Sequence, residues 1–224
     1  MKYLTFSYDD GVTQDIRLIE LFNKYGMKCT FNINSGLLGL DGYLDREGTR
    51  VSHIKVKPED VKHIYEGHEV AAHGITHPCL PRLTEEKIIE EVEGDRVKLS
   101  ELCGYDVVGF AYPGGDVDTR VSEIIKNKTG IKYCRTVISS HDFEIQKNLH
   151  EFRPSVYHHG EWDKLFELGE EFLNLKTDEK KVFYVWGHAY EFDIHNSWDR
   201  FDEFLKMMSQ SKDIIYCTNK EALL

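Results

Sequence analysis

The 224-residue chain lacks several features that mark special classes of protein. No stretch approaches the ~20 consecutive apolar residues that a membrane-spanning helix needs. The N-terminus has neither the apolar core nor the small-residue cleavage site of a secretory signal, so we expect a cytoplasmic protein. No linker, internal repeat or low-complexity segment interrupts the chain, which predicts one domain over residues 1–224.

Positive charge is also scarce. The 28 Lys and Arg residues are outnumbered by 39 Asp and Glu residues, and the net charge is −11. Nucleic acids and anionic membranes bind clustered Lys and Arg side chains, so we expect neither as a partner. The five cysteines are scattered and form no C-x-x-C pair. This arrangement predicts reduced, mostly buried thiols.

A regular alternation of strand and helix patterns runs through the chain. We expect strands at 2–8, 29–34, 68–73, 107–112, 131–137, 181–188 and 213–218. Segments with helical periodicity lie between them, whereas residues 35–57 show no clear period and are expected to form a long loop at the rim of a site. The alternation predicts an α/β fold with a parallel sheet and helices outside it. A seven- or eight-stranded barrel fits the count, and a doubly wound open sheet is the alternative.

Four of the expected strands end in unusual groups of residues. They are Asp9 and Asp10 after the first strand, His73 and His77 after the third, Tyr112 and Pro113 after the fourth, and His188 after a late strand. In a parallel barrel, the C-terminal ends of the strands meet on one face, where active sites are built. The pattern therefore predicts that these residues share one site.

The residue types at these strand ends suit a catalytic metal centre. Two histidines and one carboxylate, with water in the open position, are a common ligand set for a catalytic metal. A cation bound to one aspartate would make the adjacent carboxylate tolerable, and the second aspartate could take a proton from the water. Each motif has a plainer interpretation, because Asp-Asp-Gly forms a good turn by itself and His188 could be a satisfied core histidine. Their joint occurrence at strand ends favours the site.

The same motifs resemble those of the polysaccharide deacetylases of carbohydrate esterase family four, the chitooligosaccharide deacetylase homology domain. FSYDDG is similar to the family's T-F-D-D-G, HGITH to H-[ST]-x-x-H with Gly74 at the hydroxyl position, and VWGH to L-x-x-H. The resemblance implies a distorted (β/α)7 barrel, a divalent metal, often zinc, and hydrolytic removal of N- or O-acetyl groups from sugars. The roles it implies are general base for Asp9, metal ligand for Asp10, His73 and His77, and general acid for His188.

The chain departs from the family pattern at two places. FAYPGG stands where R-x-x-P-aromatic is expected, so the arginine that orients the base falls at Ala111. Arg153 is the candidate replacement, with a surface or structural ion pair as its alternative role. The fourth motif, which tunes the acid histidine, has no clear counterpart. The residues that we expect to contact substrate are Tyr112, Pro113, His158, His159 and Trp186, although packing or a place on the solvated surface is the alternative for the last three.

The sequence thus predicts a metal-dependent hydrolase acting on an acetylated carbohydrate. A deacylase or amidohydrolase acting on a small non-sugar amide is one alternative, because the orienting arginine and the tuning motif are missing. A catalytically inactive carbohydrate-binding homologue is another. The presence of Asp9 together with all three metal positions argues against the inactive homologue.

Overall fold

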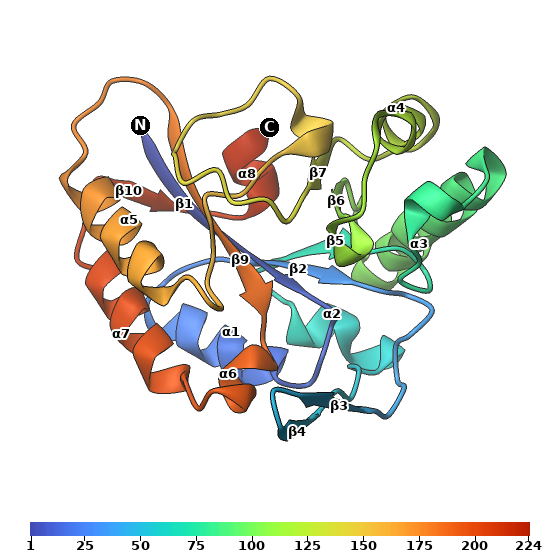
Figure 1. Cartoon of the computed structure of the whole chain (residues 1–224), viewed down its shortest axis with the longest axis horizontal. Coiled ribbons are helices and arrows are strands. Elements are labelled where there is room, and N and C mark those ends of the chain that lie inside the picture. Colours follow the sequence, from blue (N-terminus) through green and yellow to red (C-terminus); the bar gives the residue numbers. More distant parts are fainter.

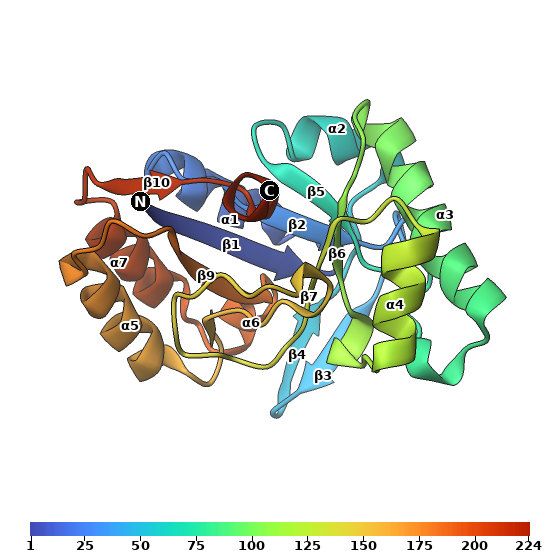
Figure 2. The same cartoon turned by 90° about the horizontal axis from the view of Figure 1, so that it is seen from above.

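The structure, a computed structural model, describes residues 1–224. Its centre is an eight-stranded parallel sheet with the order β7-β6-β5-β2-β1-β9-β8, and β10 pairs with the first residues of β1 (Figures 1 and 2). The strands are β1 (Lys2–Asp9), β2 (Thr30–Ile33), β5 (Glu69–Ala72), β6 (Gly109–Ala111), β7 (Tyr133–Arg135), β8 (Val156–Tyr157), β9 (Lys181–His188) and β10 (Ile214–Tyr216).

The sheet curls into a barrel that is incomplete on one side. Seven strands follow one another from β7 to β8. The seam between β7 and β8 has no regular strand pairing and is joined by an isolated bridge between Arg135 and Phe152 and by a few loop hydrogen bonds. The expected distorted (β/α)7 barrel is therefore confirmed, and the open doubly wound sheet is not formed.

Helices cover the outside of this barrel. They are α1 (Asp15–Lys24), α2 (Val61–Ile64), α3 (Glu85–Cys103), α4 (Thr119–Lys128), α5 (Trp162–Asn174), α6 (Glu191–Ile194), α7 (Trp198–Met208) and α8 (Asn219–Leu223). Short 3-10 turns lie at Pro58–Asp60, Leu80–Arg82, Pro113–Gly115 and Leu149–Glu151. Figure 1 shows α3 and α4 on the side of β5 to β7, and α5 and α7 on the side of β9. No helix is both long and apolar enough to cross a membrane.

The two-residue period of β1 decides which side chains enter the barrel. Phe6 packs outward, with its ring centroid 4.7 Å from that of Phe22 in α1. On the opposite face, Thr5 and Ser7 accept hydrogen bonds from the side-chain amides of Asn219 and Asn32, both at 2.8 Å. Both faces of β1 are thus buried, as is typical of a central parallel strand. Asp9, two residues beyond Ser7, consequently faces the barrel interior.

The segment 35–57 is more structured than the sequence indicated. It contains an antiparallel hairpin of β3 (Tyr43–Arg46) and β4 (Thr49–Ser52), which projects from the barrel in Figure 2. Glu47 and Gly48 form its turn, both with positive φ angles, of 52° and 77°. The expected long loop is corrected in this respect. The hairpin was missed because its strands are short and mostly exposed, and Glu-Gly is a weaker turn signal than Asn-Gly or Asp-Gly.

Candidate active site

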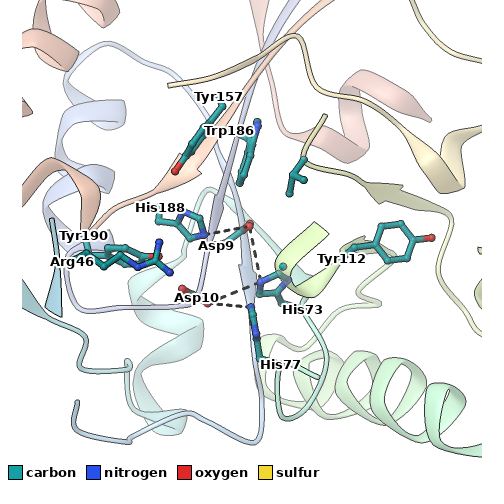
Figure 3. A pocket seen from close by; sticks show the side chains of 12 residues that line it. Asp9, Asp10, Arg46, His73, His77, Tyr112, Tyr157, Trp186, His188 and Tyr190 are labelled. Atoms are coloured by element: carbon teal, nitrogen blue, oxygen red, sulfur yellow. Dashed lines mark ion pairs between the residues drawn. The ribbon is translucent and has the colours of Figure 1, made fainter. Parts of the chain in front are cut away.

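A cavity of about 420 Å³ opens at the C-terminal ends of the barrel strands (Figure 3). The residues predicted from the sequence that line it are Asp9, Asp10, His73, His77, Tyr112, Trp186 and His188. They come from β1, β9 and the segments that follow β5 and β6. The strand ends therefore bring these residues together, as expected for a parallel barrel.

A change of backbone direction separates the two adjacent aspartates. Asp9 ends β1, whereas Asp10 has a φ of 85°, and its N–H donates to the carbonyl of Asn32 at 2.9 Å. Gly11 follows with a φ of 60°, and a Cβ atom there would lie 2.8 Å from the Ile33 side chain. Consecutive left-handed residues turn the two carboxylates to different sides.

Asp10, His73 and His77 form a possible metal-binding group. The Asp10 Oδ1 atom lies 4.0 Å from His73 Nε2 and 3.9 Å from His77 Nε2, and one donor atom from each residue lies within 4.8 Å of the others. Zinc binds nitrogen and oxygen at roughly 2.0–2.2 Å in a tetrahedron, which places two ligand atoms about 3.4 Å apart, so an ion would need to draw these donors inward by only about 0.5 Å. The spacing around Asp10 suits a single ion.

Hydrogen bonds orient His73 for metal binding. Its Nδ1 lies 2.8 Å from the Ala111 carbonyl oxygen, which can only accept a hydrogen bond. The proton of the neutral ring therefore sits on Nδ1, and the lone pair of Nε2 is free to bind a metal. Burial lowers the pKa of His73 to about 4, so the ring is neutral near pH 7, as a metal ligand must be. The buried carboxylate of Asp95 in α3 accepts the backbone N–H groups of His73 and Ser35, at 2.8 and 2.7 Å. These contacts fix the start of the loop that carries both histidines.

Two residues that follow the hairpin, His53 and Lys55, also lie against the Asp10 carboxylate. His53 Nε2 lies 3.3 Å from its Oδ2 atom, and Lys55 Nζ lies 3.7 Å from Oδ1. Burial favours the protonated acid, but His53 and Lys55 outweigh it and hold the pKa of Asp10 well below its usual value. Asp10 is therefore anionic, as a carboxylate that binds a metal must be. Sequence analysis missed this support because both residues fall in the segment expected to be a loop.

Asp9 is held by partners of its own. Asn32 donates to Oδ1 at 2.8 Å, and the guanidinium of Arg135, at the end of β7, donates to Oδ2. Arg135 is buried, and its guanidinium lies 4.4 Å from the centre of the Trp186 ring. Arg153, by contrast, is exposed, and its backbone pairs with the side chain of Gln146. The expectation for Arg153 is therefore corrected, because Arg135 supplies the guanidinium that orients Asp9.

His188 lies across the cavity from the metal-binding group, with a carboxylate behind it. Its Nε2 lies 4.0 Å from Asp9 Oδ2, and its Nδ1 lies 3.0 Å from Glu191 Oε1. Burial would lower the pKa of His188, but Glu191, with Asp10 and Asp9, raises it to about 9. Burial would raise the pKa of Glu191, but the charge and hydrogen bond of His188 lower it to about 2. Glu191 thus occupies the tuning role for which no counterpart was found in the sequence.

This combination of residues agrees with the comparison to known families. A family model described as polysaccharide deacetylase matches residues 1–134. The chain belongs to the polysaccharide deacetylase family.

Individual relatives of this deacetylase-family chain are distant. Chitin deacetylase 1 of Cryptococcus neoformans var. grubii is 30% identical over 120 residues, which are 53% of this chain and 22% of that protein. The match to a second curated relative, an uncharacterized 30.6 kDa protein of Geobacillus stearothermophilus, is 23% identical and covers 58% of this chain and 43% of that protein. The matches thus span less than half the length of these curated relatives.

Solved structures share the fold over almost the whole chain. A family 4 acetyl xylan esterase from Clostridium thermocellum in complex with a cobalt ion is 13% identical, with a TM-score of 0.60 over 98% of this chain and 89% of that one. A CE4 family pseudoenzyme from Bacillus anthracis is 15% identical, with a TM-score of 0.62 over 99% of this chain and 65% of that one. At such identities the likeness establishes the fold alone.

Aromatic residues form one wall of the cavity of this deacetylase-family protein. Trp186 stacks on Tyr157 with ring centroids 4.3 Å apart, and the Tyr190 ring lies 5.0 Å from that of His188. Tyr112 also lines the cavity, but its hydroxyl donates away from it to the His150 carbonyl. Tyr157 and Tyr190 were not expected from the sequence.

Three of the expected substrate contacts need correction. His158 is 1% exposed and stacks on Phe192 at 4.4 Å, so it is a core residue. His159 lines a second depression, outside the active-site cavity. Pro113 is buried, and the next residue, Gly114, lines the cavity in its place. Adjacent residues near a strand end point to different sides, and sequence position alone does not decide which side faces the cavity.

Proposed function

We propose that the protein is a divalent-metal-dependent hydrolase that removes acetyl groups from a carbohydrate. One observation carries the proposal: a carboxylate–histidine–histidine group lies beside a second carboxylate, Asp9, and a partly buried histidine, His188, on one cavity. Such a group suits a catalytic metal with an open position. Membership of the polysaccharide deacetylase family supports the reaction class.

The metal site and the base divide the work of the two aspartates. A divalent cation held by Asp10, His73 and His77, with zinc as the expected ion, would polarise the acetyl carbonyl and lower the pKa of a water molecule. Asp9 is free of that task because Asn32 and Arg135 occupy its oxygens. Its carboxylate is then placed to accept the proton of the attacking water.

His188 completes the proposed acid–base pair. Its raised pKa, about 9, keeps it protonated near pH 7, so it can donate a proton to the leaving amine or alcohol. The oxyanion of the transition state needs a further donor. Pro113 has no N–H, and the N–H of Tyr112 donates to the Arg135 carbonyl at 3.1 Å. We therefore assign this role to the N–H of Gly114, which lines the cavity.

A sugar substrate is favoured over a small amide. The amide alternative rested on a missing arginine and a missing tuning group, and Arg135 and Glu191 now occupy those roles. The stacked Trp186 and Tyr157 offer an apolar face suited to the acetyl methyl or a sugar ring. An inactive homologue would not need both Asp9 and the three metal positions. The cytoplasmic location stays a prediction.

Paired variants test the division of roles. We expect His77→Ala to lose the active-site metal and the activity, whereas Asp9→Asn keeps the active-site metal and loses activity by at least ~100-fold, as for a general base. Metal content is measured by mass spectrometry, and acetate release on a panel of acetylated sugars and simple amides. Loss of metal in Asp9→Asn would refute the assignment of roles. Turnover of amides but not sugars would refute the substrate class.

A further inference from the structure

We propose that Glu47, His159 and His195 form a second site for a divalent transition-metal ion, which pins the β3–β4 hairpin to the barrel. The three residues lie outside the active-site cavity, in a separate depression. They come from the hairpin turn, the segment after β8 and the end of α6. The site is distinct from the group at Asp10 and does not depend on the proposed hydrolysis.

The side chains converge on one point. Glu47 Oε1 lies 3.5 Å from His159 Nε2, and Glu47 Oε2 lies 3.3 Å from His195 Nε2. One donor atom from each residue lies within 4.8 Å of the others. The two imidazole rings have centroids 4.4 Å apart. Two imidazoles and a carboxylate suit zinc, cobalt(II) or nickel(II), with water at the remaining positions.

An ion accounts for this arrangement better than ordinary ion pairs. If both imidazoles were protonated to pair with Glu47, two like charges would lie side by side at 4.4 Å. A single divalent ion satisfies both Nε2 atoms and the carboxylate while the rings stay neutral. Arg200 is the cationic residue that lines the same depression, and its guanidinium is paired with Asp163 at 2.8 Å.

A nearby pair shows the ordinary alternative. His141 Nε2 lies 2.6 Å from Glu161 Oε1, with no second imidazole beside it. One exposed histidine on one carboxylate forms a simple ion pair, which contributes little stability. His141 is therefore a matched control for His195, since each is a partly exposed histidine on a glutamate.

Binding would also affect the wall of the active-site cavity. Glu47 occupies the hairpin turn, and the preceding residue, Arg46, lines that cavity (Figure 3). An ion that joins Glu47 to His159 and His195 would hold Arg46 at the cavity mouth. The second site would thereby fix the position of a cationic side chain that faces substrate.

Equilibrium dialysis against zinc or cobalt(II), followed by metal analysis, tests the site in a His77→Ala background. That background removes the active-site ligand set, and we expect it to retain about one equivalent of metal. His77→Ala with His195→Ala should lose that equivalent, and Glu47→Gln should lose it equally. His77→Ala with His141→Ala should keep it.

Other ratios of bound metal to protein would contradict the proposal or point to a different site. No bound metal in the His77→Ala background, or an equivalent that survives His195→Ala and Glu47→Gln, would overturn the proposal. If the active-site group binds no metal, the pattern is different. The wild type would then bind one equivalent, and this equivalent would be lost in His195→Ala and retained in His77→Ala.

Limited trypsin cleavage at Arg46 and Arg50 gives a second readout. We expect zinc to slow cleavage several-fold in the His77→Ala background and to leave the rate unchanged once His195→Ala is added. Equal slowing in both would show that the ion does not hold the hairpin through His195, contrary to the proposal.

Discussion

At the scale of single residues, the site depends on giving two neighbouring carboxylates different partners. Both carboxylates lie near His73 Nε2, at 4.0 Å for Asp10 and 3.9 Å for Asp9. Their other partners differ: Asp10 faces His77 and the His53–Lys55 pair, whereas Asp9 faces Arg135 and Asn32. A buried charge left without its partner is strongly destabilising. The guanidinium of Arg135 therefore both stabilises Asp9 in the barrel and sets the direction of its carboxylate.

Replacing Arg135 with lysine should separate charge from direction. Lysine keeps a positive charge but lacks the planar guanidinium that contacts Asp9 Oδ2 while lying over the Trp186 ring. We expect Arg135→Lys to lower kcat by about 100-fold, the order that a small misplacement of a catalytic group costs, with metal content unchanged. Arg153→Lys is the matched control, and because Arg153 is exposed its kinetics should equal the wild type. Similar kinetics for both variants would contradict the role of Arg135.

Glu191 should set the alkaline limit of activity. Its negative charge raises the pKa of His188, so Glu191→Gln should let His188 lose its proton at lower pH. We expect the alkaline limb of the kcat/KM profile to move down by about 1 pH unit or more, the usual effect of removing an adjacent charge. His188→Gln should flatten the same limb. An alkaline limb that stays in place in Glu191→Gln would remove His188 from the acid role.

At the scale of elements, β9 carries residues for two faces at once. Trp186 and His188 line the cavity, whereas Gly187, between them, packs against the His158 ring on the outer side of the strand. A Cβ atom at Gly187 would lie 1.9 Å from His158 Nδ1. The buried His158 therefore requires a glycine beside the proposed acid, and the packing of α6 and α7 around β9 depends on this close approach.

Gly187→Ala should destabilise the fold through overpacking, by about 1–3 kcal/mol. The cost should be smaller in a His158→Ala background, where the clashing ring is absent. Urea unfolding of the two single variants and the double variant measures the interaction energy. Additive effects would show that the ring of His158 is not the obstacle.

At the scale of the whole molecule, buried acids make stability depend on pH. Asp15 in α1 is fully buried, and burial raises its pKa to about 8, although the hydrogen bond from Tyr65 and the charge of Lys55 oppose the shift. The folded protein thus holds this proton to a higher pH than the unfolded chain does. Because the folded state binds the extra proton, the contribution of Asp15 is complete below about pH 4, the pKa of an unperturbed Asp. It declines as the pH rises toward 8.

The Asp15→Asn side chain cannot ionise, so this variant should not lose stability as the pH rises from about 4 to 8. We compare the melting temperature of the variant with that of the wild type at each pH. We expect the difference, variant minus wild type, to be more positive at pH 8 than at pH 5. For a chain of this size each 1 kcal/mol changes Tm by roughly 2–4 °C. Thermal unfolding in the presence of a chelator keeps metal occupancy constant between the two pH values. A Tm difference that is the same at both pH values would show that Asp15 does not titrate in this range.

Local sequence patterns were sufficient to predict much of the barrel and to identify the polar residues at its strand ends. Strand β1 and the grouping of Asp10, His73 and His77 agree with the sequence prediction. They could be predicted because strand period and the common direction of parallel strands are local or general rules. The hairpin at 43–52 was missed because its strands are short and mostly exposed.

The sequence by itself determined the alternation of strands and helices in a parallel α/β fold and the chemistry available at the strand ends. Only the tertiary structure decided which distant side chains complete the site. Arg135 is 126 positions from Asp9 and reaches it because β7 and β1 curl around a common interior. Arg153 is the arginine that the sequence analysis favoured, but it lies on the surface. The direction of a side chain depends on strand register and barrel curvature, and these follow from packing between segments far apart in the chain.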